Sequence, residues 1–530
     1  MQIFQQYRLK SREIYFWILV MLAVALPFIP QILVISQILL VLNWILEGRL
    51  SQKIKLIYQR KSILFFLLIY LVHIIWLIKT DNFQPAFTDL FMKLPLLIIP
   101  IVLGTSEPLS KSRIKQILKY FIISVVFSTL ISTAILFGII PFKFNDIRQI
   151  SVFISHIRLS LLIVISILTL FHWLISEGRS FTKRHFLYIL LCFWLFLFLI
   201  LLRSLTGLVV LCISSFLLIL IYLKSVNNQF FKIGLIMAMY AIPVFVIGYL
   251  VSAINKFYSN DTINFKNLDS YTINKNQYFN DTLYDEMENG HYVRIYICEK
   301  ELEREWNKRS KFKYSGFDLK NQPLRYALMR YMTSKGLRKD SLGLSKMKAI
   351  DIENVENGYT NYIQENKWSL YPRIYEVLWE IETYRKGLSS SGHSVTQRLV
   401  YYNIAFDFIK KYPLLGIGTG DLKISFKQYY ETHKTGLEKP FQRDTHNQFL
   451  RFLVLFGIFG FIIIMFAFII APVLEKTWTS YYFVMIFIVL FLSFINEDTL
   501  ETQVGVTFAA FFYSLFLWGM DHKSLVDYNE

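Results

Sequence analysis

Cysteine is scarce in this sequence, which contains three in 530 residues. Cys192 and Cys212 lie inside apolar runs and Cys298 stands alone in a polar region, so neither a disulfide framework nor a C-x-x-C metal site can be built. The chain also lacks an H-E-x-x-H motif, a Walker A loop and a nucleophile elbow. These absences exclude assignment to the enzyme classes that such motifs mark.

Charged side chains are also few, at 18% against about 25% in soluble domains. Hydrophobic residues make up 54% of the chain, and the mean hydropathy is +0.42. Apolar runs such as 186–202 and 233–252 approach the roughly 20 residues that cross a hydrocarbon core of about 30 Å. Such runs exclude a transmembrane barrel, whose strands have about 9–11 residues of alternating polarity. The sequence therefore predicts an all-α polytopic membrane protein.

The apolar segments predict about twelve transmembrane helices. They lie at 14–28, 31–47, 62–78, 94–104, 121–140, 159–176, 186–202, 208–223, 233–252, 449–474, 481–495 and 504–520. The segment 94–104, with Pro95 and Pro100, is short enough to be a re-entrant element instead. The predicted domains are transmembrane helices 1–9 at 1–252, a large, mainly helical periplasmic loop domain at 253–447, transmembrane helices 10–12 at 448–520, and a cytoplasmic tail at 521–530.

Basic residues exceed acidic ones by 56 to 38, which gives a net charge of +18. In a soluble protein this excess would suggest nucleic acid as a partner, but here membrane topology accounts for much of it. With the N-terminus inside, the short inside connections hold roughly 19 Lys and Arg against about six in the short outside ones. Both termini are therefore predicted to be cytoplasmic, with no nucleic-acid partner.

The pattern Ala23-Val24-Ala25 leaves signal-peptide cleavage open, although the apolar pattern resumes almost at once.

The polar stretch after residue 253 contains four predicted amphipathic helices, at 298–309, 323–335, 371–386 and 394–411. In the last of these, a stripe spaced by 3, 4 and 3 residues predicts the buried face: Leu399, Tyr402, Phe406 and Ile409. The following segment, 416–421, reads G-I-G-T-G-D. It lacks the third glycine of a dinucleotide fingerprint and follows a helix, so we reject that site; a helix C-cap followed by a turn is at least as consistent as a ligand contact.

His446 lies where the polar stretch meets the tenth span. An imidazole with an ordinary pKa near 6.5 can accept a proton at neutral pH, and at a membrane interface it can reach lipid-borne and soluble substrates. A single interfacial histidine is often structural. Gly457 and Gly460, deeper in the same span, strengthen the functional interpretation because their missing side chains allow another helix to pack closely.

Arginines near membrane depth form a second candidate set. Arg203 follows seventeen apolar residues, Arg158 opens the sixth span, and Arg398 belongs to the polar helix before the glycine turn. The first two either extend to the outer interface or face a polar cavity. If these guanidinium groups converge, they form an anion site suited to pyrophosphate, because arginine stays charged and donates bidentate hydrogen bonds. Lys93, beside the short fourth segment, is the next candidate for this charge.

These pieces occur in a recognisable order, and together they resemble the end of the O-antigen ligase/polymerase superfamily. The elements are Arg398, Ala405, Pro413-Leu414-Leu415-Gly416-Ile417-Gly418-Thr419-Gly420, and His446-Asn447-x9-Gly457-x-x-Gly460. The segments 155–158, 204–207 and 496–498 also look like family positions, whereas the loop 253–393 is not covered. Two residues depart from the pattern: Phe461 follows Gly460 where the family prefers a small or β-branched residue, and Leu205 stands where many relatives carry arginine.

The resemblance implies a metal-independent glycosyltransferase of the GT-C type, without a cofactor, in the bacterial inner membrane and with its site on the periplasmic face. Its donor would be a glycan on undecaprenyl pyrophosphate, and its acceptor lipid A-core or another glycan or protein. By the same resemblance, His446 would be the general base or position the acceptor, and Arg398, Arg203 and Arg158 would bind pyrophosphate. Asn447 would orient the donor.

Other functions stay open from the sequence. Within the same class, a polymerase or a protein O-oligosaccharyltransferase needs the same donor site and differs only in its acceptor. A transporter or flippase for lipid-linked glycans belongs to a different class. Transporters often show internal repeats and paired, Gly/Pro-broken helices, and no half-to-half repeat is visible here.

Overall fold

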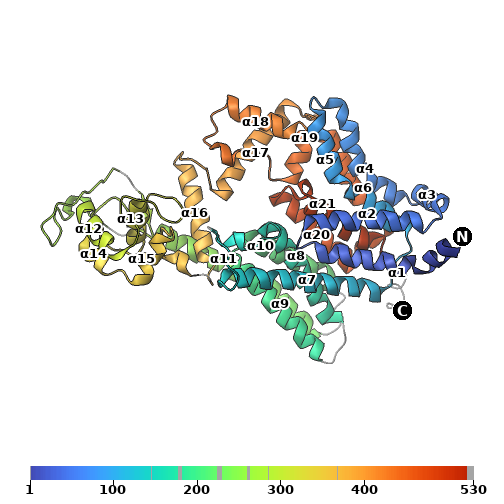
Figure 1. Ribbon diagram of the computed structural model, residues 1–530, viewed down its shortest axis with the longest axis horizontal. Helices are drawn as coiled ribbons and strands as arrows, with labels where there is room; N and C mark the ends of the chain where they lie inside the picture. The colour runs from blue at the N-terminus through green and yellow to red at the C-terminus, as the bar shows by residue number, and fades with distance from the viewer. Residues whose placement is uncertain are drawn as a thin grey trace. The chain divides into compact units, whose positions relative to one another are not determined.

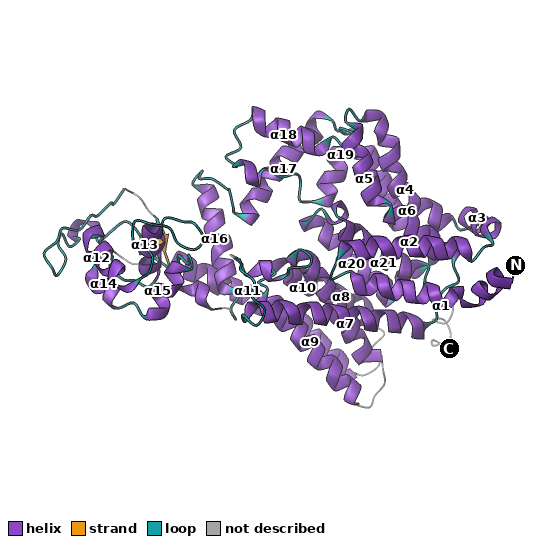
Figure 2. Cartoon of the chain, viewed as in Figure 1, coloured by secondary structure: helices purple, strands orange, loops and turns teal. Residues whose placement is uncertain are grey.

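The computed structural model describes residues 2–144, 146–176, 182–223, 229–259, 263–283, 286–366 and 368–521. Two compact units divide the chain: Met1–Leu235 together with Thr383–Glu530 form unit 1, and Ile236–Glu382 form unit 2. Helices dominate both units (Figures 1 and 2). Of the predicted cytoplasmic tail, residues 522–530 lie outside the described residues.

Unit 1 is made of helices from the two ends of the sequence. Its first part contains α1 (Gln2–Ala25), α2 (Pro30–Leu46), α3 (Leu50–Gln59), α4 (Lys61–Ile75), η1 (Trp76–Lys79), α5 (Phe83–Lys93), α6 (Pro95–Thr105), α7 (Lys111–Leu136), η2 (Ile147–Ile150), α8 (His156–Ser176), α9 (Lys183–Leu201) and α10 (Leu205–Tyr222). Its second part contains α17 (Ser394–Lys411), α18 (Leu422–Thr432), η6 (Lys439–Phe441), α19 (Gln448–Glu475), η7 (Thr477–Thr479), α20 (Tyr481–Asn496), η8 (Thr499–Glu501) and α21 (Gln503–Leu517).

The helices that reach membrane length confirm an all-α architecture of polytopic type. Within the described residues, eight helices are long and apolar enough to cross a membrane, and the bent pair α2 and α3 would make a ninth. The two apolar helices α20 and α21 are shorter, with 16 and 15 residues. The short segment at 94–104 is continued backwards by α5, which gives a 23-residue candidate span over Phe83–Thr105. A total of twelve spans stays a prediction.

Helices distant in sequence pack against each other in unit 1. α4 lies against α19, α6 against α21, and α17 also against α19, so the two ends of the chain share one apolar core (Figure 1). Aromatic rings fill part of it: Phe66 lies edge-to-face with Phe468 at 5.8 Å and with Trp518 at 5.6 Å. Such edge contacts match the positive rim of one ring to the negative face of another.

The polar stretch predicted as one loop domain is distributed over both units. α11 (Gln229–Tyr258) and α16 (Tyr371–Arg385) each cross a unit boundary. Residues 383–447, including α17 and α18, belong to unit 1. The apolar stripe predicted on α17 is wrong in part, because Leu399 and Phe406 are exposed; the buried residues are Thr396, Tyr401, Ile404 and Ala405, and part of this helix packs on α19.

Unit 2 is a small helical body with one hairpin of two-residue strands. It contains η4 (Phe265–Asn267), β1 (Met287–Glu288), β2 (His291–Tyr292), α12 (Glu299–Arg309), α13 (Leu324–Ser334), α14 (Ser341–Ser345), α15 (Ala349–Glu356) and η5 (Tyr362–Glu365). The strands pair antiparallel, with Met287 opposite Tyr292. Trp306, Leu328 and Tyr331 are fully buried in its core.

The predicted helices at 298–309, 323–335, 371–386 and 394–411 are confirmed as α12, α13, α16 and α17.

Candidate functional site

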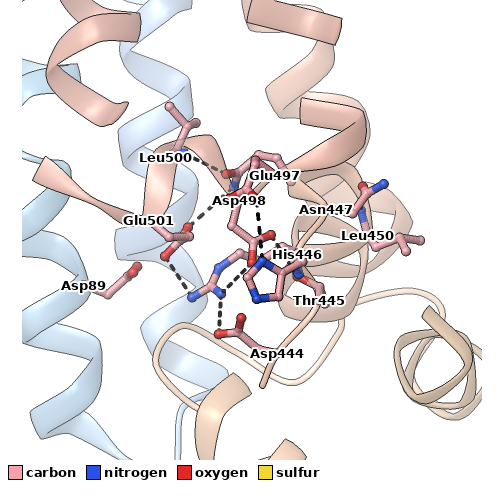
Figure 3. A network of polar contacts seen from close by, with 12 residues as sticks. Asp89, Asp444, Thr445, His446, Asn447, Leu450, Glu497, Asp498, Leu500 and Glu501 are labelled. Carbon is pink, nitrogen blue, oxygen red and sulfur yellow. Dashed lines mark hydrogen bonds and ion pairs between the residues drawn. The ribbon is translucent and has the colours of Figure 1, made fainter. Parts of the chain in front are cut away.

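His446 occupies the turn that leads into α19, and its backbone is held in an unusual conformation. Its φ is +44°, in the left-handed region that side chains other than glycine rarely adopt. The backbone N–H donates a 2.9 Å hydrogen bond to Asp498 Oδ2, and the preceding Thr445 donates from its hydroxyl to Asp498 Oδ1 at 3.0 Å. The imidazole stacks on Tyr401 of α17, with 5.5 Å between ring centres. One carboxyl group and one aromatic ring therefore fix the histidine, and Figure 3 shows its contact with Asp498.

Glu497 joins the histidine to the arginine predicted for the leaving group. Its carboxylate accepts a 3.1 Å hydrogen bond from Arg398 Nη2 and lies 3.9 Å from His446 Nδ1. That ring nitrogen is buried and has no hydrogen-bond partner among the described residues. The side chains of Arg398, His446 and Glu497 are 20%, 28% and 15% exposed. The structure thus brings His446 and Arg398 together around one carboxylate.

A deeper network of charges lies beside this group. Arg451 of α19 contacts Asp444 at 2.9 Å and Glu501 at 2.8 Å, and its guanidinium is 4.0 Å from Asp498. Lys93 of α5 is completely buried and forms ion pairs with Asp89 and, at 3.0 Å, with Glu501. Glu501 therefore links the two cations. Buried charges persist only when paired in this way, because an unpaired ion in a low-dielectric environment is very costly.

The carboxylates of this network differ in their affinity for protons. Although burial opposes ionisation, Arg451 holds the pKa of Asp444 below its ordinary value. Asp498 is more deeply buried and faces Asp444, so burial and that like charge raise its pKa well above the ordinary value. Asp444 therefore gives up its proton more readily than Asp498 does. For His446, burial lowers the pKa, with Glu497 opposing it, so the ring is neutral at neutral pH and can accept a proton.

Asn447, predicted to orient the donor, caps α19. Its side-chain oxygen accepts a hydrogen bond from Leu450 N–H at 3.0 Å, and its Nδ2 donates to the Ile495 carbonyl at 2.7 Å. The next residue, Gln448, accepts from Leu500 N–H at 2.9 Å. These bonds tie the start of α19 to the segment after α20, which carries Glu497 and Asp498.

The glycine turn, residues 413–421, forms hydrogen bonds with α19 where this helix is interrupted at Gly457. At Gly457 the helix departs from helical geometry, with φ +60° and ψ −167°. Two helical hydrogen bonds are replaced there by four to the turn: Ile417 N–H to Val454 O, Gly418 N–H to Leu455 O, Ile458 N–H to Pro413 O, and Phe459 N–H to Leu414 O, at 2.9–3.3 Å. These bonds satisfy the carbonyls of Val454 and Leu455 and the N–H groups of Ile458 and Phe459, as an apolar environment requires.

Glycine is needed on both sides of this contact. A Cβ on Gly457 would lie 2.3 Å from the Leu414 carbonyl, and one on Gly416 would lie 2.4 Å from the Leu455 oxygen. We predicted that Gly457 and Gly460 admit another helix; at Gly457 the close neighbour is instead this extended turn. The turn ends at Asp421, which accepts hydrogen bonds from Asp81 N–H at 3.0 Å and Asn82 N–H at 3.1 Å. The motif is thus a clamp between α19 and the start of α5.

The other two predicted arginines lie near the same end of α20. Arg158 interacts electrostatically with Glu497 and Asp498 and donates to Ser155 Oγ at 3.2 Å. Arg203 lies in the turn between α9 and α10, with a left-handed φ of +51°. Thr206 in the first turn of α10 accepts a 2.5 Å hydrogen bond from Asn496, which brings this turn to the residue preceding Glu497.

Sequence reasoning missed most of the acidic half of the site. Glu497 and Asp498 were noted only as family positions, and Asp444, Glu501 and Arg451 were not singled out. A signal was available, since Arg451 lies inside an apolar span, and charged residues at membrane depth mark functional or paired positions. The pairing of Arg451 with Glu501 could not be predicted because it joins residues 50 positions apart in the chain.

Comparison with known proteins agrees with the order of these elements. No curated protein matches the chain. A family model described as O-antigen ligase matches residues 349–465, from α15 to the middle of α19. This range contains Arg398, the glycine clamp and His446. It begins inside the loop 253–393, which the resemblance drawn from the sequence motifs does not cover. Over these residues the chain is similar to the O-antigen ligase family.

Proposed function

We propose that the protein is a ligase that transfers a glycan from undecaprenyl pyrophosphate to an acceptor hydroxyl, with lipid A-core as the acceptor. One observation carries the proposal: a neutral, half-buried imidazole and a guanidinium face the same carboxylate, Glu497, where α17, α19 and α20 meet. This arrangement supplies a base and an anion-binding group within one site.

In the proposed reaction, the acceptor oxygen attacks the anomeric carbon as the bond from that carbon to the pyrophosphate oxygen breaks. His446 takes the hydroxyl proton on Nε2, and Glu497 faces its Nδ1 and stabilises the imidazolium that forms. The 3.9 Å separation would shorten on binding, as catalytic contacts often do. The released lipid pyrophosphate carries the negative charge, so the site needs donors aimed at it.

Arg398 is the proposed first donor to the pyrophosphate, with Arg158 and Arg203 beside it and Asn447 orienting the glycan. Glu497 now occupies one face of the Arg398 guanidinium, and a pyrophosphate would share or take that position. Lys93 is completely buried between Asp89 and Glu501. We therefore propose that Lys93 holds Glu501 and the Arg451 network in place. The alternative is that Lys93 contacts the pyrophosphate of the donor substrate itself.

We further propose that the site faces the periplasm, with both termini in the cytoplasm and the protein in the bacterial inner membrane. The excess of basic residues in the short connections supports this orientation. Cys298 is buried, so an introduced Lys311→Cys in a cysteine-free background is the better probe. Labelling of this residue in intact cells is expected; labelling only after the membrane is opened would invert the orientation.

A deletion in the native host, complemented with the parent or with His446→Ala, tests the function. Accumulation of full-length lipid-linked glycan together with bare lipid A-core is expected for both the deletion and the variant. Loss of long chains would select a polymerase, and loss of glycan from protein would select an oligosaccharyltransferase. Transfer by purified enzyme in EDTA tests metal independence, which we expect. Glycan that stays on its original lipid in the parent reaction would support a transporter.

A further inference from the structure

A cleft outside the histidine site lies wholly within unit 2. It has a volume of about 790 Å³ and lies between the end of α11 and the segment that joins η5 to α16. Four aromatic side chains contribute to its walls: Tyr249, Tyr362, Trp368 and Tyr371. Trp368 is 57% exposed, and Tyr249 and Tyr362 are each 37% exposed. Aromatic faces are therefore available to a ligand rather than buried in the core.

A second hollow of about 270 Å³ continues the cleft. It shares Lys256, Tyr362 and Tyr371 with the first and adds Asn289, His291, Ser334 and Lys335. The two hollows therefore form one groove, aromatic at one end and polar and basic at the other. Lys256 stands at the junction, with its ammonium 4.5 Å from the centre of the Tyr371 ring.

The walls of this groove are held in place by the fold. Tyr371 packs on Tyr375 at 6.2 Å, and Tyr375 on Phe257 at 5.0 Å. Tyr249, Tyr362 and Tyr371 line the same cleft. The lining carboxylate, Glu365, accepts from Asn354 Nδ2 at 2.7 Å and from the Tyr331 hydroxyl. Its charge is thus shared with the protein wall.

We propose that this groove binds an oligosaccharide that carries an acidic group. The C–H face of a pyranose ring is apolar and packs on aromatic faces, while its hydroxyls need the amide and hydroxyl groups that Asn366 and Ser369 supply. A sugar carboxylate or phosphate would meet Lys256, with Lys335 behind it. Lys335 is already 2.6 Å from Asp351, so Lys256 is the principal cation. The inference deepens the proposed function, because it assigns a glycan-holding site apart from the reacting atoms.

The aromatic belt of a membrane protein offers a different explanation for these rings. Tyrosine and tryptophan gather at bilayer surfaces, and Tyr249 lies within the candidate span at Lys232–Tyr258. A belt, however, needs neither a concave shape nor convergent hydrogen-bonding groups. The two explanations differ in whether soluble saccharide binds without lipid contact.

The test uses the full chain in nanodiscs of phosphatidylethanolamine and phosphatidylglycerol, with hexagalacturonate as the acidic probe and maltohexaose as the neutral one. Calorimetry is expected to show saturable binding of both, tighter for the acidic probe. Trp368→Ala should weaken both by about tenfold or more, whereas Lys256→Ala should weaken only hexagalacturonate. The matched controls Tyr326→Ala and Lys311→Ala, exposed residues of unit 2 outside the groove, should bind like the parent.

Absence of saturable binding in the parent, or losses in the controls equal to those in the groove variants, would overturn the groove proposal. Glycan transfer by the same preparations separates this proposal from the proposed function. If the protein binds saccharide but transfers no glycan, the groove proposal stands and the proposed transferase function is contradicted. Normal transfer with unchanged saccharide binding in Trp368→Ala and Lys256→Ala contradicts the groove alone.

Discussion

Replacing Arg451 with glutamine is expected to destabilise the protein more than any change to an exposed arginine. The guanidinium lies 2.9 Å from Asp444, 2.8 Å from Glu501 and 4.0 Å from Asp498, and its side chain is 6% exposed. Removing one partner from a buried ion pair costs about 3–5 kcal/mol, because the remaining charge stays buried and uncompensated. Lys93 still neutralises Glu501, so we expect a loss of about 3 kcal/mol in the free energy of unfolding, mainly from the unpaired Asp444.

The measurement is the free energy of unfolding in mixed micelles, followed by tryptophan fluorescence as the SDS fraction rises. The matched control is Arg443→Gln, which removes an exposed arginine from the same segment and should change stability by about 0.5 kcal/mol or less. The double variant Arg451→Gln, Asp444→Asn should recover about 1–2 kcal/mol, because residues in one ion network are not additive. Equal stability of Arg451→Gln and Arg443→Gln would refute the argument.

Three further results are expected. Arg398→Lys and Arg203→Lys should each raise the activation free energy of transfer by about 1.5–3 kcal/mol without changing protein levels, because lysine lacks the planar guanidinium fork. Turnover close to that of the parent in both variants would reject the proposed arginine site for pyrophosphate. Gly457→Ala should lower the unfolding midpoint strongly, because the new Cβ would lie 2.3 Å from the Leu414 carbonyl. Gly248→Ala is the control and should leave the midpoint unchanged, because a Cβ there would have no neighbour within 4 Å. Equal midpoints for the two variants would contradict the contact between the glycine turn and α19. Because the pKa of Asp498 is raised in the folded protein, the free energy of unfolding should fall as the pH rises from 3.8, the ordinary pKa of this carboxyl, towards the raised pKa. Asp498→Asn should flatten this pH dependence of stability. An unchanged pH dependence in the variant would mean that another group causes it.

Much of the fold could be predicted because hydrophobic patterning is local. The run at 449–474 became α19 at Gln448–Glu475, and the amphipathic pattern at 394–411 became α17 with the same bounds. The face of α17 was predicted less well. A stripe of apolar residues is expected to face the core in water, but a helix beside a membrane can expose Leu399 and Phe406 and bury Thr396 and Ala405.

The site was partly predictable for a related reason. His446 and Arg398 are recognisable from motif order, and the structure places both at Glu497. The pairing of Arg451 with Glu501, and the hydrogen bonds between the glycine turn and the broken α19, depend on segments brought together only by folding. The short motif 416–421 shows the limit of sequence reasoning, because glycines that admit a backbone and glycines that admit a phosphate give the same pattern.

Glycan transfer by the purified protein, reconstituted with undecaprenyl-pyrophosphate-linked glycan and lipid A-core, tests the central claim most directly. His446→Ala is the informative variant, and His433→Ala, which removes an exposed histidine after α18, is its matched control. We predict that His446→Ala folds and inserts normally while its transfer rate falls by about 10²-fold or more, and that His433→Ala matches the parent. A His446→Ala protein that transfers glycan at close to the parent rate would contradict the assignment of the base and, with it, the proposed mechanism.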